Sequence, residues 1–96
     1  MDHLTVKNWD TFQHYGKRNP PWIKLHRAIL DDYGFCALHD AAKAHLMLLW
    51  LYASQHNGHI PHDTQFLERK LDITSLDLNA LIDGGFLIAA APKGGR

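Results

Sequence analysis

Three histidines at regular spacing form the densest group of metal-ligating side chains in the sequence. His56, His59 and His62 follow an H-x2-H-x2-H pattern, and a carboxylate comes directly after the last of them. Imidazole and carboxylate groups are ordinary zinc ligands, so this pattern raises the hypothesis of a metal site. However, Asn57-Gly58 and Pro61 place the histidines on a turning loop rather than on one face of a helix. We therefore predict no bound metal and no cofactor.

Residue patterns typical of catalysis are missing from the sequence. It contains no G-x-S-x-G, no glycine-rich phosphate loop and no H-E-x-x-H. The adjacent His39 and Asp40 are better explained as a helix start than as a catalytic dyad. The single cysteine, Cys36, excludes an internal disulfide and any zinc site built from several cysteines. We predict that the chain is not an enzyme.

The charge distribution is polarised although the net charge is zero. Residues 1–27 hold five basic and two acidic side chains, residues 28–92 hold three basic and eight acidic, and residues 93–96 add two basic ones. Strong non-specific binding of nucleic acid needs several phosphates neutralised together, so this balance argues against it. Candidate contacts to nucleic acid are basic side chains of the N-terminal part, of the end of the expected helix over 64–71 and of the tail, together with two polar residues of the expected final helix: Lys17, Arg18, Lys24, Arg27, Arg69, Lys70, Ser75, Asn79, Lys93 and Arg96.

The N-terminal third is expected to contain one strand and one helix. Residues 4–9 alternate apolar and polar side chains, as in a strand at the edge of a sheet. Residues 21–32 place apolar side chains on one face and charged side chains on the other, which predicts an amphipathic helix that begins at Pro21 and is closed by Gly34.

A longer helix is predicted from His39 or Asp40 to about His56. Its leucine-rich run is apolar around nearly the whole circumference, so it should be the central core helix. A very short extended segment, 58–61, should follow. Asp63 can then cap a helix over 64–71.

The stretch LNALIDGGFLI predicts the last helix and its exit into a strand. Ser75 can cap this helix, and Gly84 or Gly85 can take the left-handed conformation that ends it. Residues 86–88 read as a short strand. The resulting order predicts a mainly α fold with a small β-sheet: a winged helix-turn-helix with an extra N-terminal strand and helix. Residues 1–96 form one domain, in which 1–36 are an N-terminal extension and 37–96 a winged-helix core with a truncated wing.

Four segments resemble a known family. They are HYGKRNPPWIKLH, AILDDYGF, GHIPHD and LIDGGFL, and the likeness extends over about residues 6–88. The chain resembles the N-terminal winged-helix domains of phage and prophage replication proteins, of the replisome-organiser or initiator type. The resemblance implies a non-catalytic domain that acts with DNA in replication, in the cytoplasm of a bacterial host. Members often continue into a C-terminal region that recruits replication partners. The tail APKGGR would be the wing turn and no returning strand follows it in the sequence, so we expect either a part of something longer or a wing that is a stub.

DNA binding mainly through the phosphate backbone is the leading functional prediction. The final helix contains two aspartates and no Lys or Arg, which disfavours base readout by Ser75 and Asn79. If the basic residues of the N-terminal segment and of the tail converge in space, they can clamp a duplex through its backbone.

A protein-protein interaction or self-association module is the alternative. It is suggested by the acidic final helix and by Trp9, Phe12 and Tyr15, three aromatic side chains that we expect to be exposed and able to seat a partner. Other replication proteins or a second copy of the chain would be the partners. A membrane is not expected, because the longest apolar run, 46–53, is far too short to cross a bilayer.

Overall fold

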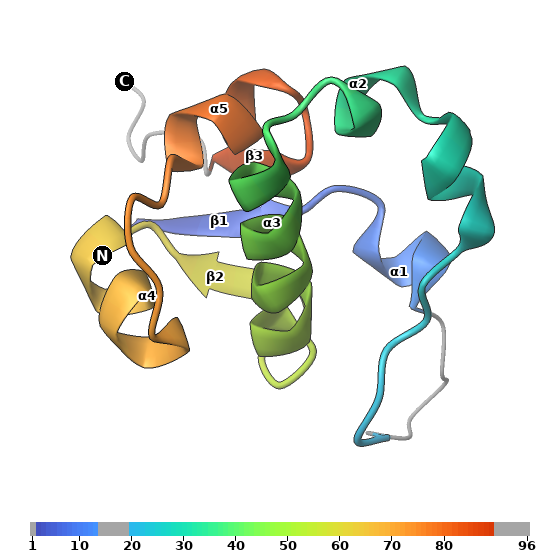
Figure 1. Ribbon diagram of the computed structural model, residues 1–96. Helices are drawn as coiled ribbons and strands as arrows, with labels where there is room; N and C mark the ends of the chain where they lie inside the picture. Colours follow the sequence, from blue (N-terminus) through green and yellow to red (C-terminus); the bar gives the residue numbers. More distant parts are fainter. Residues whose placement is uncertain (1, 14–19, 90–96) are drawn as a thin grey trace, which may run out of the picture.

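The chain folds into short helices around a three-stranded antiparallel sheet (Figure 1). The structure is a computed structural model that describes residues 2–13 and 20–89. The prediction of a mainly α chain with a small sheet is confirmed. In chain order the elements are β1 (His3–Val6), α1 (Trp9–Phe12), the 3₁₀ helix η1 (Arg27–Asp31), α2 (Tyr33–Cys36), α3 (Asp40–Ala53), β2 (His59–Pro61), α4 (Thr64–Leu71), α5 (Leu78–Asp83) and β3 (Leu87–Ala89).

The first strand occupies the middle of the sheet, whose order is β2-β1-β3. Leu4 pairs with Ile60 on one side and with Ala89 on the other. The prediction of an edge strand over residues 4–9 is therefore wrong in position and in length. An alternating pattern shows which side chains face the core, but it does not show how many neighbouring strands there are, because both neighbours come from distant parts of the chain.

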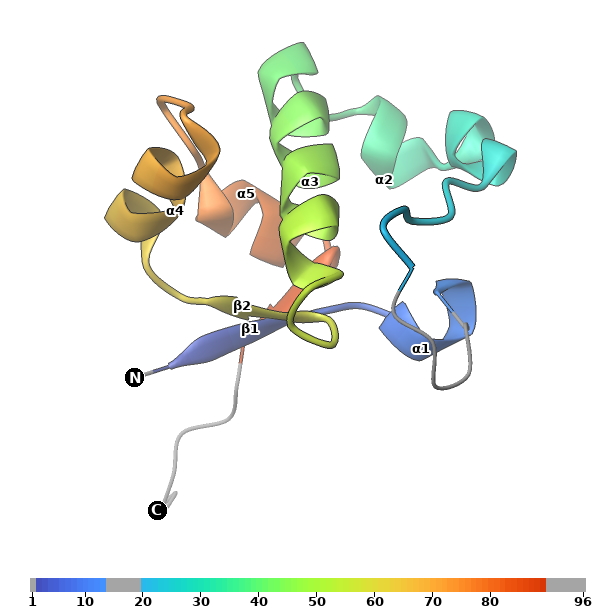
Figure 2. The ribbon, with the colours of Figure 1, turned by 90° about the horizontal axis from the view of Figure 1, so that it is seen from below.

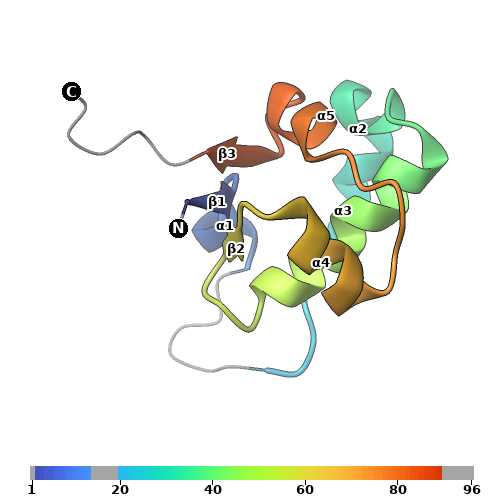
Figure 3. The same ribbon diagram turned by 90° about the vertical axis from the view of Figure 1, so that its left-hand side faces the viewer.

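Three of the described helices cover one face of the sheet. Figure 3 shows α3, α4 and α5 on the same side of the three strands. The side chains of Leu4, Val6, Ile60 and Leu87 are buried on that side. The residues between them, such as Thr5, His59 and Ile88, lie on the other face and are more exposed, as strand alternation requires.

The central helix α3 provides much of the remaining core. Leu46, Leu49 and Ala53 are completely buried, as expected for the leucine-rich run. The helix ends at Ala53 rather than near His56, because residues 54–58 form turns. Within the described residues, no helix is long and apolar enough to cross a membrane.

Side-chain caps fix the starts of α4 and α5. Asp63 Oδ1 accepts a hydrogen bond from the Phe66 N–H (3.0 Å), which confirms the predicted cap of α4. The predicted cap of the last helix is wrong: Asp77, not Ser75, caps α5 by accepting from the Ala80 N–H (3.1 Å). Ser75 lies in the preceding turn with φ 59°.

A Schellman motif joins α5 to β3. Gly85 has φ 84°, and its N–H donates to the Ile82 carbonyl (3.0 Å). The Phe86 N–H donates to the Leu81 carbonyl (3.0 Å), completing the pair of bonds that defines this helix end. Of the two glycines proposed for the left-handed position, Gly85 takes it and Gly84 stays helical. The strand then begins at Leu87, one residue later than predicted.

The predicted amphipathic helix over 21–32 does not form. Residues 22–26 are not helical, η1 covers 27–31, and Gly34 lies within α2 instead of ending a helix. The apolar side chains assigned to its buried face include Leu30 and Tyr33, which are 75% and 88% exposed. A hydrogen-bonded link between Gln13 and the backbone of Lys24 holds this segment in a non-helical conformation.

Candidate functional site

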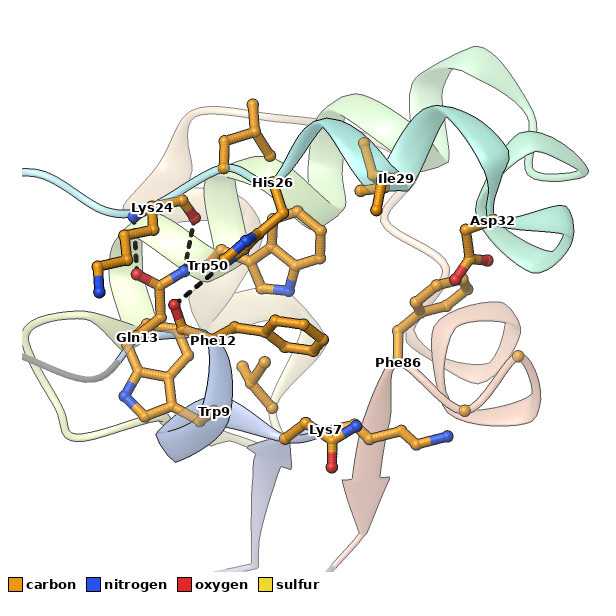
Figure 4. A pocket seen from close by; sticks show the side chains of 16 residues that line it. Lys7, Trp9, Phe12, Gln13, Lys24, His26, Ile29, Asp32, Trp50 and Phe86 are labelled. Carbon is orange, nitrogen blue, oxygen red and sulfur yellow. Dashed lines mark hydrogen bonds between the residues drawn. The ribbon is translucent and has the colours of Figure 1, made fainter.

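A cleft of about 280 Å³ opens between the N-terminal residues and the segment that precedes α2 (Figure 4). Its lining comes from the β1–α1 junction, residues 24–32, α3, and the glycine turn before β3. Most of the lining is apolar. The lining includes the side chains of Lys7, Phe12, Lys24, Asp32, Trp50 and Phe86.

Gln13 clamps one side of the cleft. Its Nε2 donates to the Lys24 carbonyl (2.6 Å), and its Oε1 accepts from the Lys24 N–H (2.7 Å). Gln13 is itself buried, so both halves of its amide are satisfied inside the protein. Beside this link, His26 Nε2 donates to the Phe12 carbonyl (3.2 Å), and the two rings are 5.1 Å apart. These contacts fix residues 24–26 against α1.

Aromatic rings from separate elements form the walls. Figure 4 shows the Phe12 and Phe86 rings projecting into the cleft from different sides, with Trp50 behind. Phe12 is 45% exposed. Phe86 is held by an edge-to-face contact with the buried Phe35 (6.4 Å between ring centroids), and Phe35 also stacks on Trp50 (6.5 Å). The rear wall is therefore braced, whereas Phe12 lies at the opening.

Two lysines and one carboxylate line the cleft. The Lys7 N–H donates to the Phe86 carbonyl (3.0 Å), which extends the β1–β3 pairing and places Lys7 beside the glycine turn. A Cβ built on Gly85 would lie 3.9 Å from Lys7 Nζ. The Asp32 carboxylate caps α2, because its Oδ1 accepts a hydrogen bond from the Phe35 N–H (2.8 Å).

Four of the basic residues predicted to contact nucleic acid lie in the described part of the chain, and they form two separate groups. Lys24 and Arg27 lie at and beside the cleft, whereas Arg69 and Lys70 are exposed in the last turn of α4. Figures 1 and 2 place α4 and residues 27–36 on opposite sides of α3. The other four predicted basic contacts, Lys17, Arg18, Lys93 and Arg96, lie outside the described residues, as does Tyr15.

The surface of α4, α5 and the adjoining turns carries mostly negative charge. Asn79 is exposed on α5, and Ser75 lines a second hollow of about 480 Å³ between the start of α3 and the turn that leads into α5. Neither has a basic neighbour within α5. Residues 59–89 hold five acidic side chains against Arg69 and Lys70.

The first two histidines of the H-x2-H-x2-H pattern have different surroundings. His56 stacks on Tyr52 (4.5 Å between ring centroids), whereas His59 packs against His3 (5.0 Å) on the open face of the sheet. Among the described residues, no three His, Cys, Asp or Glu side chains are grouped so that they could hold a metal ion.

Most of the residues that line the cleft were not predicted from the sequence. Phe12 was expected to be exposed and is, but Trp9 is only 8% exposed, because its ring packs against the backbone at Gly58. Trp50 and Phe86 could not be distinguished from core residues within their apolar runs. Lys7 had one usable signal: it follows the alternating Leu4–Val6 pattern directly and so had to lie near the end of a strand.

Comparison of the chain with protein-family models, with curated proteins and with solved structures finds no match.

Proposed function

We propose that the chain is a non-catalytic winged-helix domain of the phage or prophage replication-protein type, and that it binds DNA mainly through backbone phosphates. The observation that carries the proposal is the order α3–β2–α4–α5–β3, in which two consecutive helices lead directly into a sheet strand. The resemblance of residues 6–88 to replisome-organiser domains supports the same class, and with it a location in the bacterial cytoplasm.

The small sheet fits this class with one alteration. A wing normally continues into a returning strand that pairs with the strand leaving the last helix. Here β1 already pairs with β3 along one edge. In the described residues, the N-terminal strand thus lies between β2 and β3 and completes a three-stranded sheet.

Charge favours the cleft side over α5 as the DNA-binding surface. A helix that ends in Asp83 and is capped by Asp77 would bring negative charge toward phosphates. Lys7, Lys24 and Arg27 are exposed at or beside the cleft. Contacts from that side position the protein on DNA without reading sequence, so we expect low sequence specificity.

Fluorescence anisotropy with labelled duplex and single-stranded DNA at two salt concentrations tests the proposal. We expect binding that weakens as salt rises, because counterions are released from neutralised phosphates. Binding no tighter than about 100 μM at low salt would refute it, since non-specific DNA binders usually reach that range.

Two charge-reversal pairs locate the surface. Lys24→Glu with Arg27→Glu should weaken binding strongly, whereas Arg69→Glu with Lys70→Glu, on the other side of α3, should weaken it less. Charge reversal at Lys17 and Arg18, which precede Lys24 in the sequence, tests these two residues in the same way. The opposite ranking of the first two pairs would move the DNA to the α4 side.

Protein-protein interaction or self-association is a second candidate, favoured by a specific observation. Leu25, Leu30 and Tyr33 are highly exposed apolar or aromatic side chains within one short segment. Such a cluster is a common feature of interaction sites. Light scattering over a wide concentration range tests self-association, and a constant monomer mass would exclude it.

A further inference from the structure

We infer that the cleft receives one unstacked base of single-stranded DNA, with the adjoining phosphate held near Lys7. This inference rests on the proposed DNA-binding function and adds to it the form of nucleic acid and the site of the base. It is argued from the size of the cleft, its rings and its charge.

The size of the cleft limits the occupant to about one ring. Sites for drug-sized ligands and cofactors usually measure roughly 300–1,000 Å³. At about 280 Å³, this cleft falls just below that range. A single base with part of its sugar is therefore a better match than a whole dinucleotide cofactor.

The rings suit a flat occupant. Proteins that hold single strands stack bases on aromatic side chains, since every base presents a π-face. Phe12 projects into the cleft from α1 and is half exposed, so its ring is available (Figure 4). Phe86 faces the cleft from the other side, and its contact with Phe35 holds it in place.

The charge of the lining distinguishes a nucleotide from an apolar peptide side chain. Lys7 and Lys24 line the cleft with one carboxylate, Asp32, which is engaged with the backbone of α2. In the described part of the chain, Lys7 Nζ joins no ion pair; the ion pair found there is Lys43–Asp40 (3.8 Å). An occupant that combines a flat apolar body with an adjacent negative charge matches both features.

Little base specificity should result. Two amide side chains line the cleft, Asn8 and Gln13, and Gln13 already donates to and accepts from the backbone of Lys24. Recognition must then come mainly from stacking, which tolerates any base.

The experiment compares two oligonucleotides that carry equal charge. One is a short labelled oligothymidylate, and the other has the same length and phosphates but no bases. Anisotropy titration of the whole chain should give roughly 5- to 150-fold tighter binding of the thymidylate, the range expected for stacking of one base. The variant Phe12→Ala should remove this difference. The matched variant Phe66→Ala, which trims a 37% exposed ring on α4, should keep it.

A second variant keeps the inference testable if Phe12→Ala does not fold. Lys7→Gln alters an exposed side chain and should make the log–log salt slope for the thymidylate shallower by about 0.7, the value for one phosphate on a single strand. Lys43→Gln is its control and should leave the slope unchanged.

The outcomes separate the two proposals. Equal affinity for the two oligonucleotides, or an unchanged salt slope in Lys7→Gln, would overturn the base-binding inference while duplex binding still supported the proposed function. Failure of the chain to bind duplex and single strand alike would overturn the proposed function and, with it, this inference.

Discussion

Replacing Gly58 by alanine should destabilise the domain more than any other glycine-to-alanine change in the described residues. Gly58 has φ 85°, a conformation that costs an L-residue roughly 1–2 kcal/mol. The new Cβ would also meet the Trp9 ring at 2.6 Å from Cγ and 2.8 Å from Cδ1. Those atoms belong to a buried side chain, so the strain cannot be relieved by a small rotation into solvent.

Together, the backbone strain and the overpacking should lower the free energy of unfolding by about 2–4 kcal/mol. Overpacking a core costs about 1–3 kcal/mol, and the lower entropy of the unfolded alanine variant offsets about 0.4–1 kcal/mol of the loss. A domain of this length is typically stable by about 5–14 kcal/mol, so the change removes a large part of the total. Thermal unfolding followed by circular dichroism should show a fall of about 10–30 °C in Tm.

Gly34→Ala is the matched control. A Cβ there would lie 3.4 Å from Asp32 Oδ1 and 3.5 Å from Phe86 Cζ, which is ordinary contact, and the residue is already within α2. We expect the control variant to be as stable as the parent or more stable by up to about 1 kcal/mol. If Gly58→Ala proved no less stable than Gly34→Ala, the packing of Trp9 on the Gly58 backbone would be refuted.

Four further substitutions test the rest of the framework. Leu4→Ala should lower the free energy of unfolding, measured by urea denaturation, by about 2–5 kcal/mol because Leu4 is fully buried. Its control, Leu30→Ala, changes an exposed side chain and should alter that free energy by less than about 0.5 kcal/mol. Gln13→Ala should cost about 1–3 kcal/mol and speed hydrogen exchange at the Lys24 amide, which loses its acceptor; unaltered exchange there would contradict the clamp. Gly85→Ala should cost about 1–2 kcal/mol from its φ of 84° alone, less than Gly58→Ala, because the space around it is open.

The elements predicted correctly are those specified by neighbouring residues. The apolar run of α3 and the cap supplied by Asp63 are local signals, and both appear where expected. The glycine turn is equally local, since Gly85 satisfies the bonds of the helix that it ends.

The predictions that failed depend on distant residues. Residues 21–32 have the periodicity of an amphipathic helix, but Gln13 binds the backbone of Lys24 from outside the segment. The middle position of β1 depends on β2 and β3, which lie far along the chain. The cleft was missed for the same reason, because its walls come from four separate segments.

The pairing of β1 with β3 has a consequence for synthesis on the ribosome. Among the described elements, β1 with Leu4 and Val6 is synthesised before the others, whereas its partner β3, Leu87–Ala89, is synthesised after them. A nascent chain that has reached only β2 can form half of the sheet, and its unpaired edge is open to strands of other chains until β3 arrives. Folding that depends on such long-range strand pairing is slow. The domain is therefore most prone to aggregation during its synthesis, before β3 has paired with β1.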